Sequence, residues 1–264
     1  MSVAQEPVGT LLREWRMRRR LSQLDLALEA EVSTRHLSFV ETGRAQPSRE
    51  MILKLAERLD IPLREQNDLL LAGGFAPVYR DRSLESPALA QAREAVQRIL
   101  TGHEPYPALA IDRHWNLLAF NQAIGPLLAG IAPELLQPPV NVLRLSLHPD
   151  GLAPRIVNLA EWRAHLFDRL DRQIAHTADP QLIALRQELA NYPFENTEEH
   201  GRIDALLVPL VLRTESGELR LFSTTTVFGT PLEITLAELA IEAFFPANAE
   251  TAELLRAMNV ATVS

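Results

Sequence analysis

The chain has 264 residues, of which 47% are hydrophobic and 23% charged, so it can bury the core of one large domain or of two smaller ones. It contains no cysteine, which excludes disulfides, thiol catalysis and cysteine-ligated metal sites. The formal net charge of −8, averaged over the whole chain, argues against a polyphosphate partner.

The charge is unevenly distributed along the chain. Residues 1–75 contain 11 basic and 11 acidic residues, so the whole negative balance lies in the remainder. This asymmetry is typical of two units with different partners. The N-terminus lacks the apolar stretch of a signal peptide, and the longest uncharged stretch, residues 116–133, contains Gly and Pro and is a poor membrane span. We therefore expect a cytoplasmic protein with no membrane segment.

The first part of the chain predicts five short helices separated by tight turns. The second, third, fourth and fifth helices are each preceded by a residue that favours the start of a helix: Ser22, Ser33, Ser48 and Pro62. Ser22 and Asp25 have the spacing of a capping box. Two short helices joined by a tight turn and clamped by others form a helix-turn-helix arrangement.

Apolar and polar residues recur at fixed positions in this segment: Leu21-Ser22-Gln23, Leu26-Ala27, Val32-Ser33, Leu37-Ser38, Glu41-x-Gly43, Pro47-Ser48 and Leu55-Ala56-x-x-Leu59. The pattern resembles the XRE/Cro family of DNA-binding domains. It departs at one point, because the family often has Gly where this chain has Glu31, which is mildly strained if that position needs a positive φ. The resemblance also implies an ion pair between Arg16 and Glu41 that ties the first helix to the third.

In such domains the second helix of the pair lies in the major groove, with its N-terminal residues at the base edges. The resemblance places Thr34, Arg35, Ser38 and Phe39 there. Arg35 is suited to bind guanine with two hydrogen bonds, whereas Thr34 and Phe39 offer apolar contact to a thymine methyl group.

Contacts to phosphate are expected on either side of this helix. Gln23 stands at the start of the preceding helix, where the helix dipole and free N–H groups also favour an anion, and Arg44 and Arg49 are further candidates. Because one such unit reads only half a site, we expect a homodimer on double-stranded DNA.

The chain changes character after residue 78, where we place a boundary between domains 1–78 and 79–264. In the second domain we expect a helix at 87–102, a hairpin of strands at 108–112 and 115–119, helices at 121–131 (interrupted at Gly125-Pro126), 139–147, 158–177 and 180–191, strands at 205–213, 219–228 and 238–245, and a helix at 249–258. This order predicts an α+β domain with an antiparallel sheet of about five strands and covering helices, which resembles a PAS domain.

Further segments match a known pairing of domains: Leu37–Arg44, His103–Ala108, Asn141–Arg144, His148–Leu152, Glu161–Arg163 and Glu238–Phe244. Together they resemble the MmyB-like transcriptional regulators over nearly the whole chain. That family joins an XRE-type helix-turn-helix to a PAS-like ligand-binding domain. The resemblance implies that the second domain is a sensor, but it does not supply the ligand.

Small-molecule sites are mostly apolar with a few placed polar groups, and polar residues within apolar segments of the second domain fit that description. The candidates are Asn141, Arg144, His148, Arg155, Trp162, His165, Phe222 and Phe244. An inward Arg144 or Arg155 would bind a carboxylate, so an apolar carboxylic acid such as a fatty acid is the preferred ligand class. The alternatives are that the aromatic residues are core and that Arg144 pairs with an acid such as Asp150.

Nothing in the sequence indicates catalysis. The patterns G-x-S-x-G, G-x-G-x-x-G and H-E-x-x-H and the P-loop are absent, and the seven histidines are scattered. We expect no enzyme, no metal and no cofactor. The alternative function is a DNA-binding dimer whose second domain serves only dimerisation or protein docking. A well-formed apolar cavity favours the sensor, whereas a filled core with a large apolar surface patch favours docking.

Overall fold

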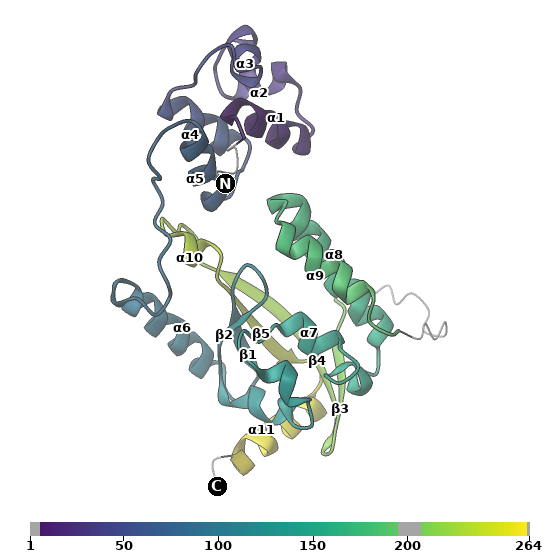
Figure 1. Cartoon of the computed structure of the whole chain (residues 1–264). Coiled ribbons are helices and arrows are strands. Elements are labelled where there is room, and N and C mark those ends of the chain that lie inside the picture. Colours follow the sequence, from purple (N-terminus) through teal and green to yellow (C-terminus); the bar gives the residue numbers. More distant parts are fainter. Residues whose placement is uncertain (1–5, 195–206, 263–264) are drawn as a thin grey trace. The chain divides into compact units, whose positions relative to one another are not determined.

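The computed structural model describes residues 6–194 and 207–262, and it divides the chain into two compact units (Figure 1). The first unit contains the chain up to Arg82 together with the short segments Ala175–Thr177 and Leu232–Ile234. The first unit is helical, with α1 (Val8–Arg18), α2 (Gln23–Glu29), α3 (Thr34–Glu41), α4 (Arg49–Arg58) and α5 (Leu63–Ala72). All five predicted helices are confirmed. The structure does not test the predicted domain boundary after residue 78.

Serine side chains begin three of these helices as the sequence predicts. Ser22 and Asp25 form both halves of a capping box on α2. The hydroxyls of Ser33 and Ser48 each accept a hydrogen bond from a backbone N–H in the first turn of α3 and α4. Each cap satisfies a donor that the helix itself cannot.

Three helices of the first unit end on a non-glycine residue in the left-handed region. Arg20, Glu31 and Asp60 follow α1, α2 and α4 with φ angles of 57°, 51° and 48°. After α2, the N–H of Val32 donates to the carbonyl oxygen of Ala27 at 2.9 Å, which closes a Schellman turn. This position therefore takes the left-handed conformation with a glutamate, where the family that the sequence resembles often has glycine.

The core of the first unit lies between the five helices, and two features lock α1 to α3. Gly9 is packed against α3 so closely that a Cβ on it would lie 2.1 Å from the carbonyl oxygen of Val40. The ion pair implied by the resemblance is present: Arg16 Nε donates to Glu41 Oε1 at 2.7 Å and Arg16 Nη2 donates to Glu41 Oε2 at 2.8 Å. Both residues of this pair are buried.

The second unit combines a sheet with helices. Its α-helices are α6 (Ala90–Gly102), α7 (Val142–Leu147), α8 (Leu159–Thr177), α9 (Pro180–Ala190), α10 (Ile234–Ala237) and α11 (Ala249–Thr262). Its 3₁₀ helices are η1 (Pro87–Leu89), η2 (Gln122–Leu128), η3 (Pro133–Leu136) and η4 (Ala153–Arg155). Its strands are β1 (Ala108–Ile111), β2 (Leu117–Phe120), β3 (Leu210–Thr214), β4 (Gly217–Val227) and β5 (Ala240–Pro246).

The five strands form one antiparallel sheet in the order β2-β1-β5-β4-β3. This confirms the predicted α+β class and its PAS-like sheet. The long strand β4 pairs with β3 through Gly217–Leu221 and with β5 through Leu221–Val227, so only Leu221 is paired on both sides.

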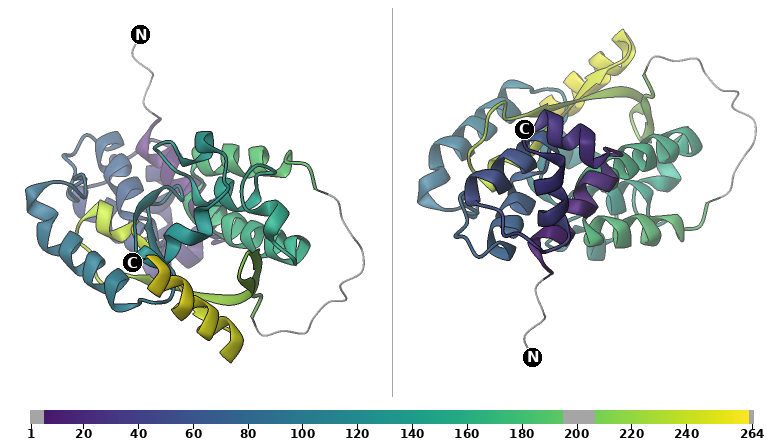
Figure 2. Two further views of the ribbon diagram at one scale, coloured as in Figure 1. Left: turned by 90° about the horizontal axis from the view of Figure 1, so that it is seen from below. Right: turned by 90° about the horizontal axis from the view of Figure 1, so that it is seen from above.

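The two faces of the sheet carry different cores. Ala108 and Ala110 of β1 face α6, which supplies Val96 and Leu100 to a small cluster. The opposite face carries the main core, built with α7, α8 and α9. In two views α8 and α9 lie side by side (Figure 2). Among the described residues, no helix is long and apolar enough to cross a membrane.

Two predicted helices of the second unit are wrong in kind or length. Residues 121–131 were expected to be helical, but only the 3₁₀ helix η2 forms there, and it contains Pro126, which lacks the N–H that an α-helix needs. A helix expected from residue 139 begins at Val142 instead, after Asn141 as its N-cap. The helix predicted over residues 139–147 is therefore shorter at its start, and of the candidates Asn141, Arg144 and His148 only Arg144 lies within α7, because Asn141 precedes the helix and His148 follows it.

The first predicted strand of the last third is also shorter than expected. Residues 205–213 were predicted as a strand, and β3 begins at Leu210, directly after Pro209. Residues 205 and 206 lie outside the described part of the chain. A proline at this point cannot donate to a neighbouring strand, which is consistent with a strand that starts behind it.

Candidate functional site

Helix α3 holds the four residues predicted to read bases, all within its first six positions. Arg35 is exposed, and Thr34, Ser38 and Phe39 are partly exposed. The Arg35 guanidinium carbon lies 5.3 Å from the centre of the Phe39 ring, so the two side chains occupy one face of the helix. The opposite face of α3 is buried in the core of the first unit, and this burial fixes which side chains the helix presents.

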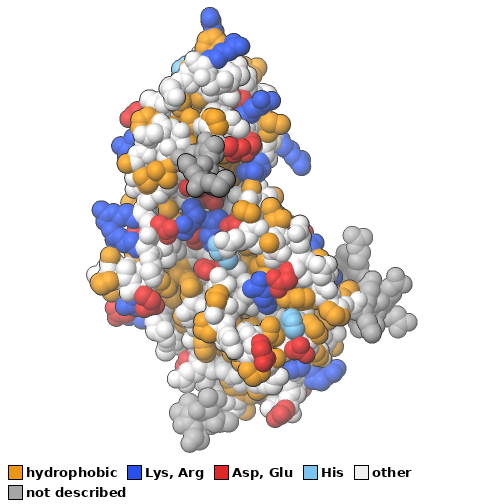
Figure 3. Space-filling model, viewed as in Figure 1, with side chains coloured by type: hydrophobic (Ala, Val, Ile, Leu, Met, Phe, Trp, Pro, Cys, Tyr) orange, Lys and Arg blue, Asp and Glu red, His pale blue; other side chains and the backbone are white. Residues whose placement is uncertain are grey.

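The side chain of Gln23 is held by the buried ion pair of the first unit. Its Nε2 donates to Glu41 Oε2 at 2.7 Å, and the same oxygen accepts from Arg16. Gln23 is thereby positioned at the start of α2, while Arg44 and Arg49 are exposed near the ends of α3 and α4. Lys and Arg side chains are visible on several parts of this unit (Figure 3).

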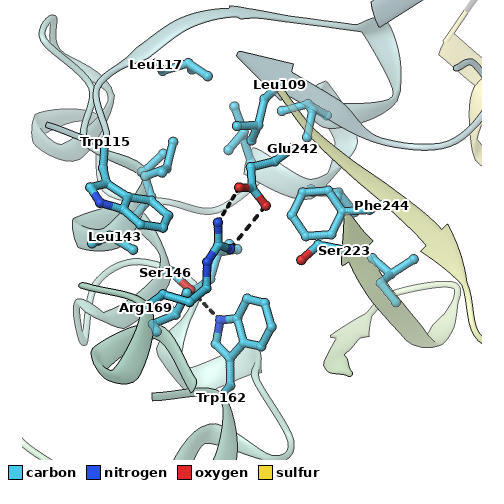
Figure 4. Close-up of a pocket in the computed structure, with 18 residues that line it drawn as sticks. Leu109, Trp115, Leu117, Leu143, Ser146, Trp162, Arg169, Ser223, Glu242 and Phe244 are labelled. Carbon is cyan, nitrogen blue, oxygen red and sulfur yellow. Dashed lines mark hydrogen bonds and ion pairs between the residues drawn. The ribbon is translucent and has the colours of Figure 1, made fainter. Parts of the chain in front are cut away.

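The second unit contains an apolar cavity of about 110 Å³ between the sheet and the helices α7 and α8 (Figure 4). Its walls are leucine, isoleucine, valine, tryptophan and phenylalanine side chains for the most part. The polar exceptions are Ser146, Ser223, Arg169 and Glu242. A single water needs only about 10–15 Å³, so the cavity has room for a group of several non-hydrogen atoms.

Two of the eight predicted ligand-binding residues line this cavity, Trp162 and Phe244. The indole Nε1 of Trp162 donates to Ser146 Oγ at 2.9 Å, which fixes the ring against the cavity (Figure 4). His165 stacks on Trp162 with ring centres 5.4 Å apart but does not line the cavity itself. Phe222 stacks on Phe245 and is also outside the lining.

The two arginines predicted to hold a carboxylate are bonded elsewhere. Arg144 donates from Nε and Nη2 to the two carboxylate oxygens of Glu188, both at 2.7 Å, rather than to Asp150. This guanidinium is the first cause that holds the pKa of Glu188 below its ordinary value. Arg155 donates to the carbonyl oxygens of Leu127 and Ala129. Neither arginine is among the residues that line the cavity.

The remaining two candidates are also engaged outside the cavity. Asn141 caps α7, accepting hydrogen bonds from Leu143 N and Arg144 N. His148 lies edge-on to Tyr192, with ring centres 4.9 Å apart. The phenol of Tyr192 donates to Glu188, and burial, followed by that hydrogen bond, raises the pKa of the phenol.

The two charged residues of the cavity, Arg169 and Glu242, are absent from the sequence-based candidates. Glu242 is 4% exposed and stands on β5 between apolar residues, and Arg169 projects from α8. They form an ion pair that joins the helix to the strand. The signal that marks Glu242 is an acid within the apolar run Ala240–Phe244, since a buried charge in a strand requires a partner.

Trp115 completes the polar end of the cavity. Its backbone is left-handed, with a φ of 66°, and its Nε1 donates to Gln173 Oε1 on α8 at 2.8 Å. The Arg169 guanidinium carbon lies 4.8 Å from the centre of its ring. The loop between β1 and β2 is thus connected to α8 at the place where the ion pair lies.

The chain combines a helix-turn-helix unit with a PAS-like unit that contains an apolar cavity. This combination is typical of DNA-binding transcription regulators with a ligand-binding domain. The helix-turn-helix family matches residues 12–66, and the MmyB-like transcription regulator ligand binding domain matches residues 92–258. The chain belongs to this MmyB-like family, as the sequence resemblance implied.

Other comparisons add little. No curated protein matches the chain. A solved structure described as "Structure of an RNA-binding Light-Oxygen-Voltage Receptor" is similar over 97% of this chain, at 13% identity and with a TM-score of 0.27. The chain spans 63% of the length of that protein's chain, and a likeness this slight carries no argument about fold or function.

Proposed function

We propose that this transcription regulator is a cytoplasmic homodimer that senses an apolar small molecule through the cavity of its second unit. Ligand binding would shift the dimer between states of different DNA affinity. Such a shift requires that the ligand bind one state more tightly than the other. The observation that supports the proposal is a cavity with almost wholly apolar walls in a chain that also carries a helix-turn-helix unit.

DNA recognition is assigned to α3, with Thr34, Arg35, Ser38 and Phe39 at the bases. Gln23, Arg44 and Arg49 are assigned to phosphates. The support is their exposure on elements that are themselves held by a buried core. Base contacts specify the sequence, whereas phosphate contacts contribute affinity without specificity.

One observation favours the alternative, in which the second unit only dimerises or docks another protein. Leu118 and Phe120 on the edge strand β2 are 40% and 46% exposed. Large exposed apolar side chains at a sheet edge are typical of a surface that another chain covers. If this alternative holds, replacing both residues by Thr abolishes dimerisation or docking, and no small molecule alters DNA binding.

The test uses duplexes selected by the full chain from a random pool. Arg35→Ala should weaken binding to the selected site by about 1–3 kcal/mol and relax one base position. Arg49→Ala, the matched control, should weaken binding to all sequences alike and reduce the salt dependence.

The sensor function is tested with the same duplex and a panel of apolar alcohols and carboxylic acids. A ligand at 100 times its Kd should raise the stability of the chain by about 2.7 kcal/mol and change its DNA affinity. If no member of the panel raises the melting temperature or changes DNA affinity, the sensor proposal is wrong and the docking alternative stands.

A further inference from the structure

The cavity wall carries one cation and one anion, and the two are bonded to each other (Figure 4). Arg169 Nη1 donates to Glu242 Oε2 at 3.2 Å, and Arg169 Nη2 donates to Glu242 Oε1 at 2.5 Å. The hydroxyl of Thr225, on β4, donates to the same Oε1 at 2.8 Å and accepts from Arg169 Nη2 at 3.1 Å. Both oxygens of the carboxylate therefore have donors.

The surroundings leave this pair electrically balanced. On α8 the nearby charged or titratable groups are His165, Asp168 and Arg172. Asp168 and Arg172 bond to each other at 2.9 Å on the exposed side of the helix. Burial, followed by the charge of Arg169, lowers the pKa of His165, which favours the neutral form of this ring. From the β1–β2 loop the pair meets the ring of Trp115, and from β4 it meets the hydroxyl of Thr225.

A ligand carboxylate at this place would meet an arginine that is already neutralised. If it displaced Glu242, a carboxylate with 5% side-chain exposure would lose its cation. If it did not, two carboxylates would share one guanidinium inside an apolar wall. Either arrangement buries an uncompensated negative charge, which is strongly unfavourable unless one of the two carboxylates takes up a proton.

We propose that the cavity holds the polar end of its ligand at the Arg169–Glu242 pair and accepts that end only with no net charge, so that a carboxylic acid binds with uptake of one proton from solvent. The inference rests on the proposed ligand-binding function and defines its chemistry. The proton resides either on the ligand or on Glu242, and both routes have the same stoichiometry. A hydroxyl, amide or ester end requires no proton.

This inference revises the carboxylate preference drawn from the sequence. That preference relied on Arg144 or Arg155 facing inward, and both are bonded outside the cavity lining. The arginine that does line the cavity has its own anion. Arg169 and Glu242 are accordingly specificity-determining residues, because together they set which charge state of a ligand the cavity accepts.

The experiment compares octanoic acid with 1-octanol on the full chain at pH 6, 7 and 8 and constant ionic strength. Trp115 and Trp162 line the cavity, so tryptophan fluorescence reports binding, and calorimetry confirms it. The Kd of octanoic acid should rise about tenfold per pH unit, because one proton is taken up per ligand. The Kd of 1-octanol should not change with pH.

The variant Glu242→Gln removes the anion and leaves the arginine without its counter-ion. Octanoate should then bind with a Kd that is independent of pH and that is lower at pH 8 than in the unchanged protein, while octanol binding shows that the cavity is intact. The double variant Arg169→Met/Glu242→Gln removes both charges, and its octanoate Kd should again rise about tenfold per pH unit.

The outcomes separate this inference from the function on which it rests. If octanol binds but the octanoate Kd of the unchanged protein is the same at pH 6 and pH 8, the charge restriction is wrong and the ligand cavity stands. A Glu242→Gln variant that binds octanol and keeps the tenfold dependence for octanoate also overturns it. If neither probe binds at any pH, the ligand-binding function itself fails, and the inference fails with it.

Discussion

The turn of the helix-turn-helix can be tested by comparing Gly with Ala substitutions. Gly should be the more stable of the two at Glu31, in the turn, and the less stable at Glu57, in a helix. Glu31 has a φ of 51°, a conformation that costs an L-residue about 1–2 kcal/mol and glycine almost nothing. Glycine loses about 0.5–1 kcal/mol through its greater freedom in the unfolded chain. Glu31→Gly should therefore be more stable than Glu31→Ala by roughly 0.5–1 kcal/mol.

Comparing two substitutions at one position removes the complication of the Lys54 ion pair, since Ala and Gly both delete the 2.8 Å contact. The control is Glu57, which is exposed within α4. There the helical backbone favours Ala over Gly by about 1 kcal/mol. Urea unfolding of the full chain, followed through amide signals of the first unit, measures both differences. If the Gly variant is less stable than the Ala variant at both positions, the left-handed backbone at Glu31 does not cost the free energy assumed here.

Three further outcomes are expected. Glu41→Gln, which leaves the buried guanidinium of Arg16 without its anion, should destabilise the first unit by about 3–5 kcal/mol in urea unfolding. Leu166→Ala, in the cavity wall, should cost about 2–5 kcal/mol, part of which a bound apolar ligand restores in a thermal shift assay. The pKa of Glu188 is held below its ordinary value by the hydrogen bonds from Arg144, so its contribution is complete above the unfolded pKa of about 4.3 and is lost as the pH falls through the lower folded value. Stability measured between pH 6 and pH 3 should therefore fall less steeply in Glu188→Gln than in the unchanged chain.

The helices of the first unit could be predicted from the sequence because their signals are local. Ser22 and Asp25 are three residues apart, and their cap forms without help from the rest of the chain. The same holds for Ser33 and Ser48, each of which binds an N–H within its own first turn. The turn at Glu31 was marked by family resemblance, and its positive φ follows from the Schellman hydrogen bonds around it.

The cavity could be predicted only in part, because its charged pair joins residues 73 positions apart. Spacing along α8 places Trp162 on one face, but it does not say which strand lies opposite. Arg144 illustrates the same limit, since helical periodicity cannot reveal that Glu188, 44 positions away, receives both of its hydrogen bonds. The side chains whose positions depend on partners far away in the sequence are therefore the ones that were predicted wrongly, such as Arg144, or were not predicted at all, such as Arg169 and Glu242.

The pairing of β4 with different neighbours along its length has a consequence for the exchange of its backbone amides with solvent. From Gly217 to Leu221 the strand is bonded to β3, and from Leu221 to Val227 it is bonded to β5 on its other side. Successive N–H groups of a strand point to opposite sides. Every second backbone amide of β4 should therefore exchange slowly with solvent. Before Leu221 these are the amides that point toward β3, and after Leu221 they are the amides that point toward β5. That residue also lines the cavity, so a bound ligand would contact the point where the β3–β4 hairpin joins the rest of the sheet.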